Sequence, residues 1–225
     1  MTTVGSFRAR MVRRRASHSH GVVLLLIVAA FLFAATASDA SWTYSVLVLL
    51  QSLTLVAALW TSGIAKLDSP LSLAFLLIAI GLAVANLLAT SNGLTGAVSI
   101  VSGGLVLGIA FVIAVSVASE REVNGQSIIG AICVYILLGL MFLFLYGAIA
   151  TLGPGPFFAQ GMDGSRALRL YFSYVTLATL GYGDYTPRTD LGHTTAVVEA
   201  LLGQLYLVTV VALLVARMRT RREPT

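Results

Sequence analysis

Six long apolar stretches constrain this chain more than any other feature of its sequence. Each approaches the roughly 20 residues that a helix needs to cross a bilayer. Of the 225 residues, 58% are hydrophobic and only 10% are charged, which is too apolar for a soluble domain. We therefore expect an all-α membrane protein with six transmembrane helices. The stretches are residues 21–38, 43–64, 70–90, 95–118, 127–152 and 193–216.

The basic residues predict how such a chain is oriented. When the chain crosses the membrane six times from a cytoplasmic start, every Lys and Arg except Arg166, Arg169 and Arg188 falls on the cytoplasmic side. This asymmetry is typical of membrane proteins. It predicts a multi-pass protein of the cell membrane with a basic cytoplasmic N-terminus (1–20) and a basic cytoplasmic tail (217–225). Orientation explains the basic ends, so we expect membrane lipid as a partner and no nucleic acid.

The first apolar stretch has a second interpretation. Arginines at 13–15 precede it, and Ala-Thr-Ala follows at 35–37, a pattern that resembles a secretory signal peptide. The stretch is close to spanning length, which favours a retained helix. Cleavage after Ala37 would leave five spans without inverting the remainder.

Residues 21–118 are predicted to form a four-helix membrane domain without voltage-sensor charges. Between Asp68 and Glu120 the sequence has no Lys, Arg, Asp or Glu. A helix without charge cannot respond steeply to the membrane potential. We therefore expect a scaffold or lipid-facing role for these helices.

A short motif near the C-terminal end carries the functional signal. Residues 176–184 read T-L-A-T-L-G-Y-G-D. Gly181 and Gly183 permit positive φ, so successive peptides can alternate in hand and turn their carbonyls to one side. Thr179 adds a hydroxyl oxygen, and the Tyr182 ring is expected to pack outward. Such a row of oxygens can bind a dehydrated cation in place of the water molecules that it has lost.

This motif and its flanks resemble the helix–filter–helix pore module of bacterial potassium channels, over about residues 127–219. The resemblance implies a re-entrant pore helix at 165–178, a filter at 179–184 and an inner helix at 193–216. The re-entrant segment would lie between the fifth and sixth helices. One loop supplies a quarter of an oxygen ring, so a homotetramer with a potassium-channel-like pore is implied. The expected filter residues are Thr179, Leu180, Gly181, Tyr182, Gly183 and Asp184, with K+ held at the first four.

The resemblance also implies supports for the filter. Aromatic residues of the pore helix form a cuff in this family, and Tyr171 is the candidate donor to Asp184, with Phe172 and Thr176 beside it. The alternative is that these aromatics only pack or sit at the membrane interface. Glu199 is an acidic residue inside a predicted span, where a carboxyl group is costly and indicates function. We expect it to support the filter from behind or to confer pH sensitivity.

The inner helix holds the candidate gate. Gly203 lies where the family often has a hinge glycine, although glycine also serves close helix packing. Gln204, Leu207 and Val211 share a helical face, which we expect to line the cavity. Leu207 and Val211 could form an apolar constriction that gates by dewetting.

The predicted function is a potassium-selective channel that is not steeply voltage-gated. It is not expected to be an enzyme, and its only ligand is the permeant K+. Ala178 and Leu180 depart from the family's usual threonine and valine but leave the carbonyls unchanged. The alternatives are a non-selective cation channel and a non-conducting or regulatory membrane subunit of a potassium uptake system. A single, near-complete motif argues against the uptake subunit.

Overall fold

The computed structural model describes residues 19–62, 70–88, 91–119 and 125–220, and these residues form seven helices. The predicted all-α class is confirmed for this part of the chain. Much of the predicted basic ends, 1–20 and 217–225, lies outside it. The helices are α2 (Ser19–Thr36), α3 (Ser41–Ser62), α4 (Pro70–Leu88), α5 (Asn92–Ser119), α6 (Gly125–Leu152), α7 (Arg166–Leu177) and α8 (Asp190–Thr220).

Each predicted apolar stretch lies on one of these helices. The largest difference is in α8, which runs from Asp190 to Thr220 where 193–216 was expected. Among the described residues, α3, α5, α6 and α8 are long and apolar enough to span a bilayer. The apolar parts of α2 and α4, His20–Thr36 and Leu76–Leu88, are shorter. The chain is therefore a multi-pass membrane protein, whereas the count of six spans stays a prediction.

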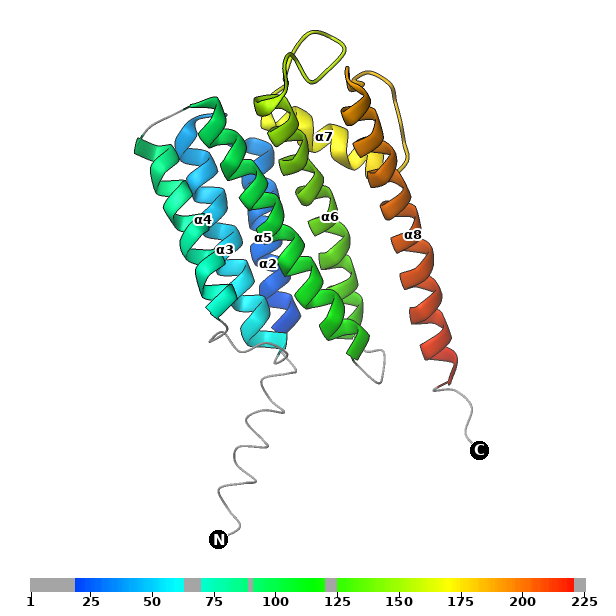
Figure 1. The fold of residues 1–225 in the computed structure, drawn as a ribbon. Coiled ribbons are helices and arrows are strands. Elements are labelled where there is room, and N and C mark those ends of the chain that lie inside the picture. Colours follow the sequence, from blue (N-terminus) through cyan, green and yellow to red (C-terminus); the bar gives the residue numbers. More distant parts are fainter. Residues whose placement is uncertain (1–18, 63–69, 89–90, 120–124, 221–225) are drawn as a thin grey trace.

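Helices α2 to α5 form a bundle that packs against α6. α5 packs against α6, and α2 contacts α3, α6 and α7 (Figure 1). Apolar side chains of α2, α3, α5 and α6 meet in the main core. α2 contributes fully to this core, since Val23, Ile27 and Ala34 are buried. The first apolar stretch is thus an integral part of the packed structure.

α7 lies at one end of the bundle, next to the start of α8 (Figure 1). An aromatic cluster joins it to α6 and to the loop between them. In this cluster the Phe172 ring of α7 lies 5.1 Å from the Tyr146 ring of α6 and 5.5 Å from Phe158 of the loop. Phe158 also forms an isolated bridge with Pro187, which follows the motif. The loops on both sides of α7 are therefore tied together.

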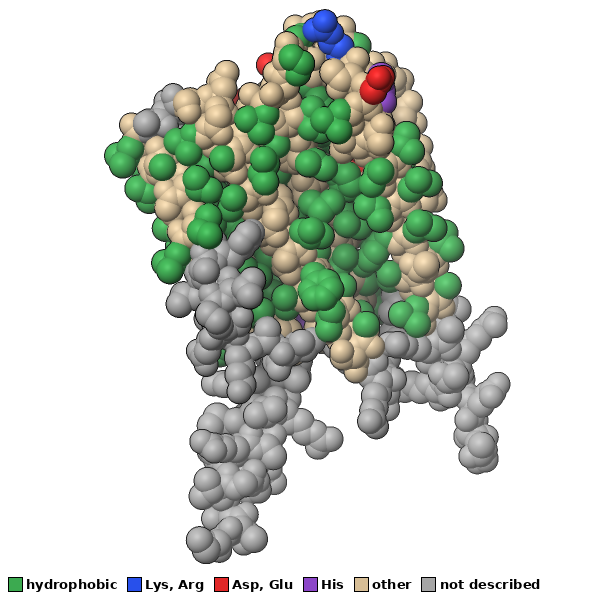
Figure 2. All heavy atoms as spheres, viewed as in Figure 1, with side chains coloured by type: hydrophobic (Ala, Val, Ile, Leu, Met, Phe, Trp, Pro, Cys, Tyr) green, Lys and Arg blue, Asp and Glu red, His purple; other side chains and the backbone are tan. Residues whose placement is uncertain are grey.

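The outer surface of the helices is apolar, as Figure 2 shows along the visible flank. α8 is the least covered of the candidate spans, because only 11% of its apolar part within Asp190–Val210 is buried in the chain. Within the described residues, this helix lacks the packing that covers α5 and α6. Its exposed large apolar side chains are Leu191, Val197, Val198, Leu201, Leu202, Leu205, Leu207, Val208 and Leu213.

Candidate functional site

The helix α7 directly precedes the motif, and the residue before its first turn, Ser165, caps its N-terminus. Ser165 precedes the helix in an extended conformation, and its side chain accepts a hydrogen bond from the Leu168 N–H at 3.1 Å. Serine is among the preferred residues at this position because it satisfies an amide that the helix cannot. Gly164, the residue before this N-cap, has a positive φ of 69°.

The chain leaves α7 through a fixed series of backbone hydrogen bonds. The Thr179 N–H donates to Thr176 O at 2.9 Å, and the Leu180 N–H donates to Val175 O at 2.9 Å. These bonds tie residues 179–184, here called the 179–184 loop, to the last turn of the helix. The start of the loop is therefore positioned by the end of α7.

The backbone of the 179–184 loop alternates in hand. φ is 55° at Thr179, 56° at Gly181 and 76° at Gly183, while Leu180 and Tyr182 do not have positive φ. Alternation at the two glycines is what a row of inward carbonyls requires. Thr179 joins the series although positive φ is rare for a β-branched residue. Its hydroxyl oxygen accepts a hydrogen bond from Gln204 Nε2 of α8 at 2.9 Å, which helps to hold it there.

The loop is open to its surroundings in a single chain. Residues 178–184 are all exposed, including Leu180 at 57% and Tyr182 at 66%. A single chain therefore lines the 179–184 loop on one side only, and the other side of the loop is not covered by the described residues.

The end of the loop is held from two directions. Tyr171 Oη of α7 donates to Asp184 Oδ2 at 2.8 Å, which joins the pair proposed from the sequence. This hydrogen bond raises the pKa of Tyr171 above its usual value. Gln160 Nε2, from the loop before α7, donates to the Asp184 carbonyl at 2.8 Å. The sequence did not predict this contact of Gln160, because no motif links it to Asp184, 24 residues later.

Glu199 lies behind α7 in a fully buried cluster. Its carboxylate accepts from Tyr146 Oη of α6 at 2.5 Å, and Ser173 Oγ of α7 lies 2.5 Å from its other oxygen. Ser173 Oγ is also 2.8 Å from the Gly139 carbonyl of α6. The group thus joins α6, α7 and α8 at one point. Neither partner of Glu199 was predicted from the sequence.

The candidate gate residues have different surroundings. Gly203 is buried, and a Cβ there would overlap the carbonyl oxygen of Leu177 at the end of α7. This close approach favours the packing role of the glycine, and the hinge stays a prediction. Gln204 and Leu207 are exposed on α8. The side chain of Val211 lies outside the described residues.

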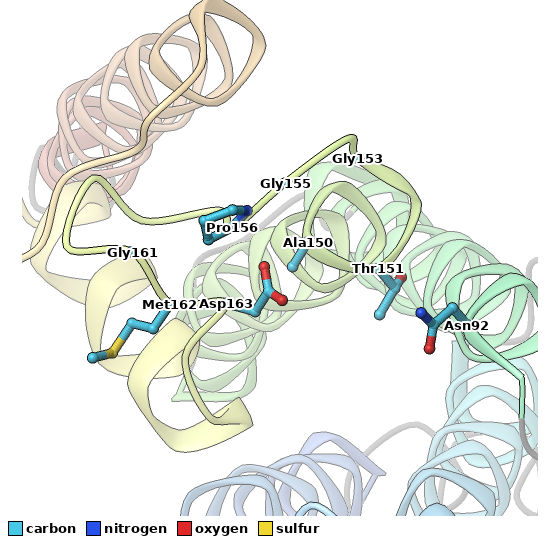
Figure 3. A pocket seen from close by; sticks show the side chains of 9 residues that line it. All are labelled: Asn92, Ala150, Thr151, Gly153, Gly155, Pro156, Gly161, Met162 and Asp163. Atoms are coloured by element: carbon cyan, nitrogen blue, oxygen red, sulfur yellow. The ribbon is translucent and has the colours of Figure 1, made fainter.

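A separate hollow of about 410 Å³ lies beside the C-terminal end of α6 (Figure 3). Asn92, Thr151 and Asp163 supply polar atoms to its lining. Asp163 Oδ1 accepts from the Phe157 N–H at 2.9 Å, so this carboxylate closes the loop before α7. Residues of the 179–184 loop do not line the hollow.

A family comparison identifies the part of the chain that holds the 179–184 loop. Residues 130–220 match the family model described as "Ion channel". This part of the chain is therefore an ion-channel domain, and the resemblance found in the sequence is confirmed for it.

A particular relative matches a shorter part. Over 56 residues the chain is 45% identical to "Probable potassium channel protein 2" of Methanocaldococcus jannaschii. The match covers 24% of this chain and 16% of that protein. No solved structure matches the chain.

Proposed function

We propose that this protein is a potassium-selective channel in which four identical chains surround one pore. The observation that carries the proposal is the alternation of positive φ at Thr179, Gly181 and Gly183. Carbonyl oxygens in such a row replace the hydration shell of K+. K+ would bind at the oxygens of Thr179, Leu180, Gly181 and Tyr182, and Asp184 would end the row.

The open side of the chain supports the tetramer. An ion in the pore needs oxygens all round, and one 179–184 loop provides them on one side only. α8, the helix that contacts this loop through Gln204, also exposes many apolar side chains. Three more copies would cover both features in a closed ring, as cyclic symmetry requires.

The proposed arrangement in the cell membrane follows from the sequence. Six spans, surrounded by lipid, would place both termini in the cytoplasm and the 179–184 loop near the outer face. α2–α5 would form a domain that does not sense voltage steeply. Leu207 and Val211 would constrict the inner part of the pore.

The test is ion flux through purified protein in liposomes. Vesicles loaded with K+ should release it when the external solution lacks K+, and barium should block the release. The same vesicles loaded with Na+ should release little. Crosslinking in the same membranes should give a product of four chains.

The outcomes separate the proposal from its alternatives. Equal K+ and Na+ flux would identify a non-selective cation channel. A verified tetramer without flux, even after Val211→Ser is introduced to open the apolar constriction, would identify a non-conducting or regulatory subunit of a potassium uptake system. Either result would overturn potassium-selective conduction.

Tyr171→Phe tests the tie at the end of the loop. It removes the hydrogen bond to Asp184 and keeps the ring. One such bond contributes about 1 kcal/mol in each chain, so K+ flux should decay at least about fivefold faster as the loop loses its conducting shape. Tyr185→Phe is the control, because it removes a neighbouring hydroxyl and keeps the ring contact with Phe158 at 5.5 Å. Equal decay in both variants would contradict the role of the Tyr171 bond.

A further inference from the structure

The beginning of α7 is bound by the turn between α2 and α3, a contact that the proposed pore does not require. Arg166, the first residue of α7, is only 1% exposed. Its guanidinium donates to the carbonyls of Ala34, Ala37 and Ser38 at 3.2, 3.0 and 2.9 Å. A fourth hydrogen bond, of 2.8 Å, reaches Thr43 Oγ1 on α3. These bonds use most of the five donors of an arginine side chain.

The electrostatics show why an arginine fits this turn. The last carbonyls of a helix lack partners and carry partial negative charge, so the end of α2 favours a cation. The N-terminus of α7 has the opposite polarity and disfavours one. Arg166 therefore occupies its position for its contacts with α2 and α3, against the field of its own helix.

The turn also contributes a side chain that binds the backbone of α7. Asp39 Oδ1 accepts from the Arg166 backbone N–H at 2.9 Å and places a carboxylate at the N-terminus of α7, where it is favoured. Tyr44 of α3 lies between two arginines of α7. Its ring centre is 5.2 Å from the Arg166 guanidinium carbon, and its hydroxyl is 3.4 Å from Arg169 Nη2.

We propose that Arg166 is a positioning residue, through which the N-terminal bundle fixes α7 and thereby the 179–184 loop. The proposal rests on the channel function proposed above. The later part of α7 is held by α6, since Tyr174 Oη donates to Ile136 O at 2.6 Å and Ser173 lies near Gly139 O. Arg166 holds the other end, so α7 cannot pivot about its later contacts. The bundle thereby acquires a function in permeation without carrying gating charges.

Two conservative variants of the full chain test this role in liposomes. Thr43→Val keeps the side-chain shape and removes the hydroxyl that accepts from Arg166 and donates to Ser38 O and Ala40 O within the turn. Arg166→Lys keeps the charge, but a single ammonium group cannot reach the diverging acceptors that a guanidinium serves. We expect the K+/Na+ flux ratio to fall at least about tenfold in Arg166→Lys, since the loss of one hydrogen bond to a charged group already corresponds to about that factor. Thr43→Val should change it in the same direction.

Ser45→Ala is the matched control on α3. Its hydroxyl donates to Ala83 O of α4 at 2.8 Å and has no part in the contact with α7. The ratio should stay at its wild-type value in this variant. Combining Thr43→Val with Arg166→Lys should add little to Arg166→Lys alone, since both remove the same interaction. Amide hydrogen exchange in the first turn of α7 should quicken in both variants and not in the control.

The results distinguish a positioning role from a purely structural one. If Thr43→Val and Arg166→Lys lower the melting temperature but leave the flux ratio and the α7 exchange at control values, the proposal is wrong. Absence of K+ flux in both the wild-type protein and Val211→Ser would instead refute the channel function. In that case the exchange comparison alone decides whether Arg166 anchors α7.

Discussion

In the proposed tetramer, we expect Gly181→Ala to remove nearly all K+ flux without preventing assembly. Gly181 has a φ of 56°, and a Cβ there would meet nothing within 4 Å in the single chain. The substitution therefore acts through the backbone, because left-handed conformation costs a residue with a Cβ about 1–2 kcal/mol. That cost arises in every copy of the ring and favours turning the peptide over, which takes a carbonyl away from the ion. We expect at least about a hundredfold loss of flux, since four such costs add in one pore.

Gly161→Ala is the matched control for this prediction. Gly161 has a φ of 81°, and a Cβ there also meets nothing within 4 Å. It lies in the loop before α7, outside the 179–184 loop. The same local strain should therefore leave K+ flux close to the wild-type value. Liposome flux, normalised to the amount of crosslinked tetramer, makes the comparison. Similar losses in both variants would mean that general loop strain is responsible.

We expect Glu199→Ala to destabilise the protein strongly and to reduce K+ flux. The carboxylate is fully buried, and its loss leaves the Tyr146 hydroxyl without its acceptor and opens a cavity. We expect a loss of about 3 kcal/mol in the free energy of unfolding. Ser173 should suffer less, because its hydroxyl can turn to the Gly139 carbonyl at 2.8 Å. Reversible unfolding in mixed detergent and SDS measures the change.

A second substitution shows whether the unpaired hydroxyl is the cause. Tyr146→Phe removes that hydroxyl, so the double variant with Glu199→Ala should be more stable than Glu199→Ala alone. Replacing both partners of a buried hydrogen bond costs less than removing one. Glu199→Gln keeps an acceptor for Tyr146 and should lie between the wild-type protein and Glu199→Ala. If Glu199→Ala is as stable as the wild-type protein, the cluster does not hold the three helices together.

The sequence located the pore segments because their signals are local. Apolar length marks the helices, and a motif of nine residues, 176–184, marks the loop. The resemblance to the pore module predicted a helix at 165–178, close to the observed Arg166–Leu177. Thr179 was not expected to have positive φ, because local rules assign that conformation to glycine. Its bond to Gln204 comes from another helix and could not be anticipated.

The partners of buried polar groups could not be predicted in the same way. Glu199 was found because a carboxyl group in an apolar run is conspicuous. Its contacts with Tyr146 and Ser173 span 53 and 26 residues, and only the packing of three helices creates them. Arg166 was assigned to the outer side because it lies in the loop between the fifth and sixth predicted spans. A charge count contains no information on burial, so its contacts with Ala34 and Thr43 were missed.

The open side of α8 also bears on how a cell makes this protein. A newly inserted chain would present the backbone of its 179–184 loop and the Gln204 amide to lipid, where exposed polar groups are strongly disfavoured. If four chains form one pore as proposed, a lone subunit is therefore disfavoured in the bilayer, and membrane proteases would degrade it. Synthesis of neighbouring copies close together in time would protect the chain. The yield of working pores should thus rise more steeply than the amount of chain produced.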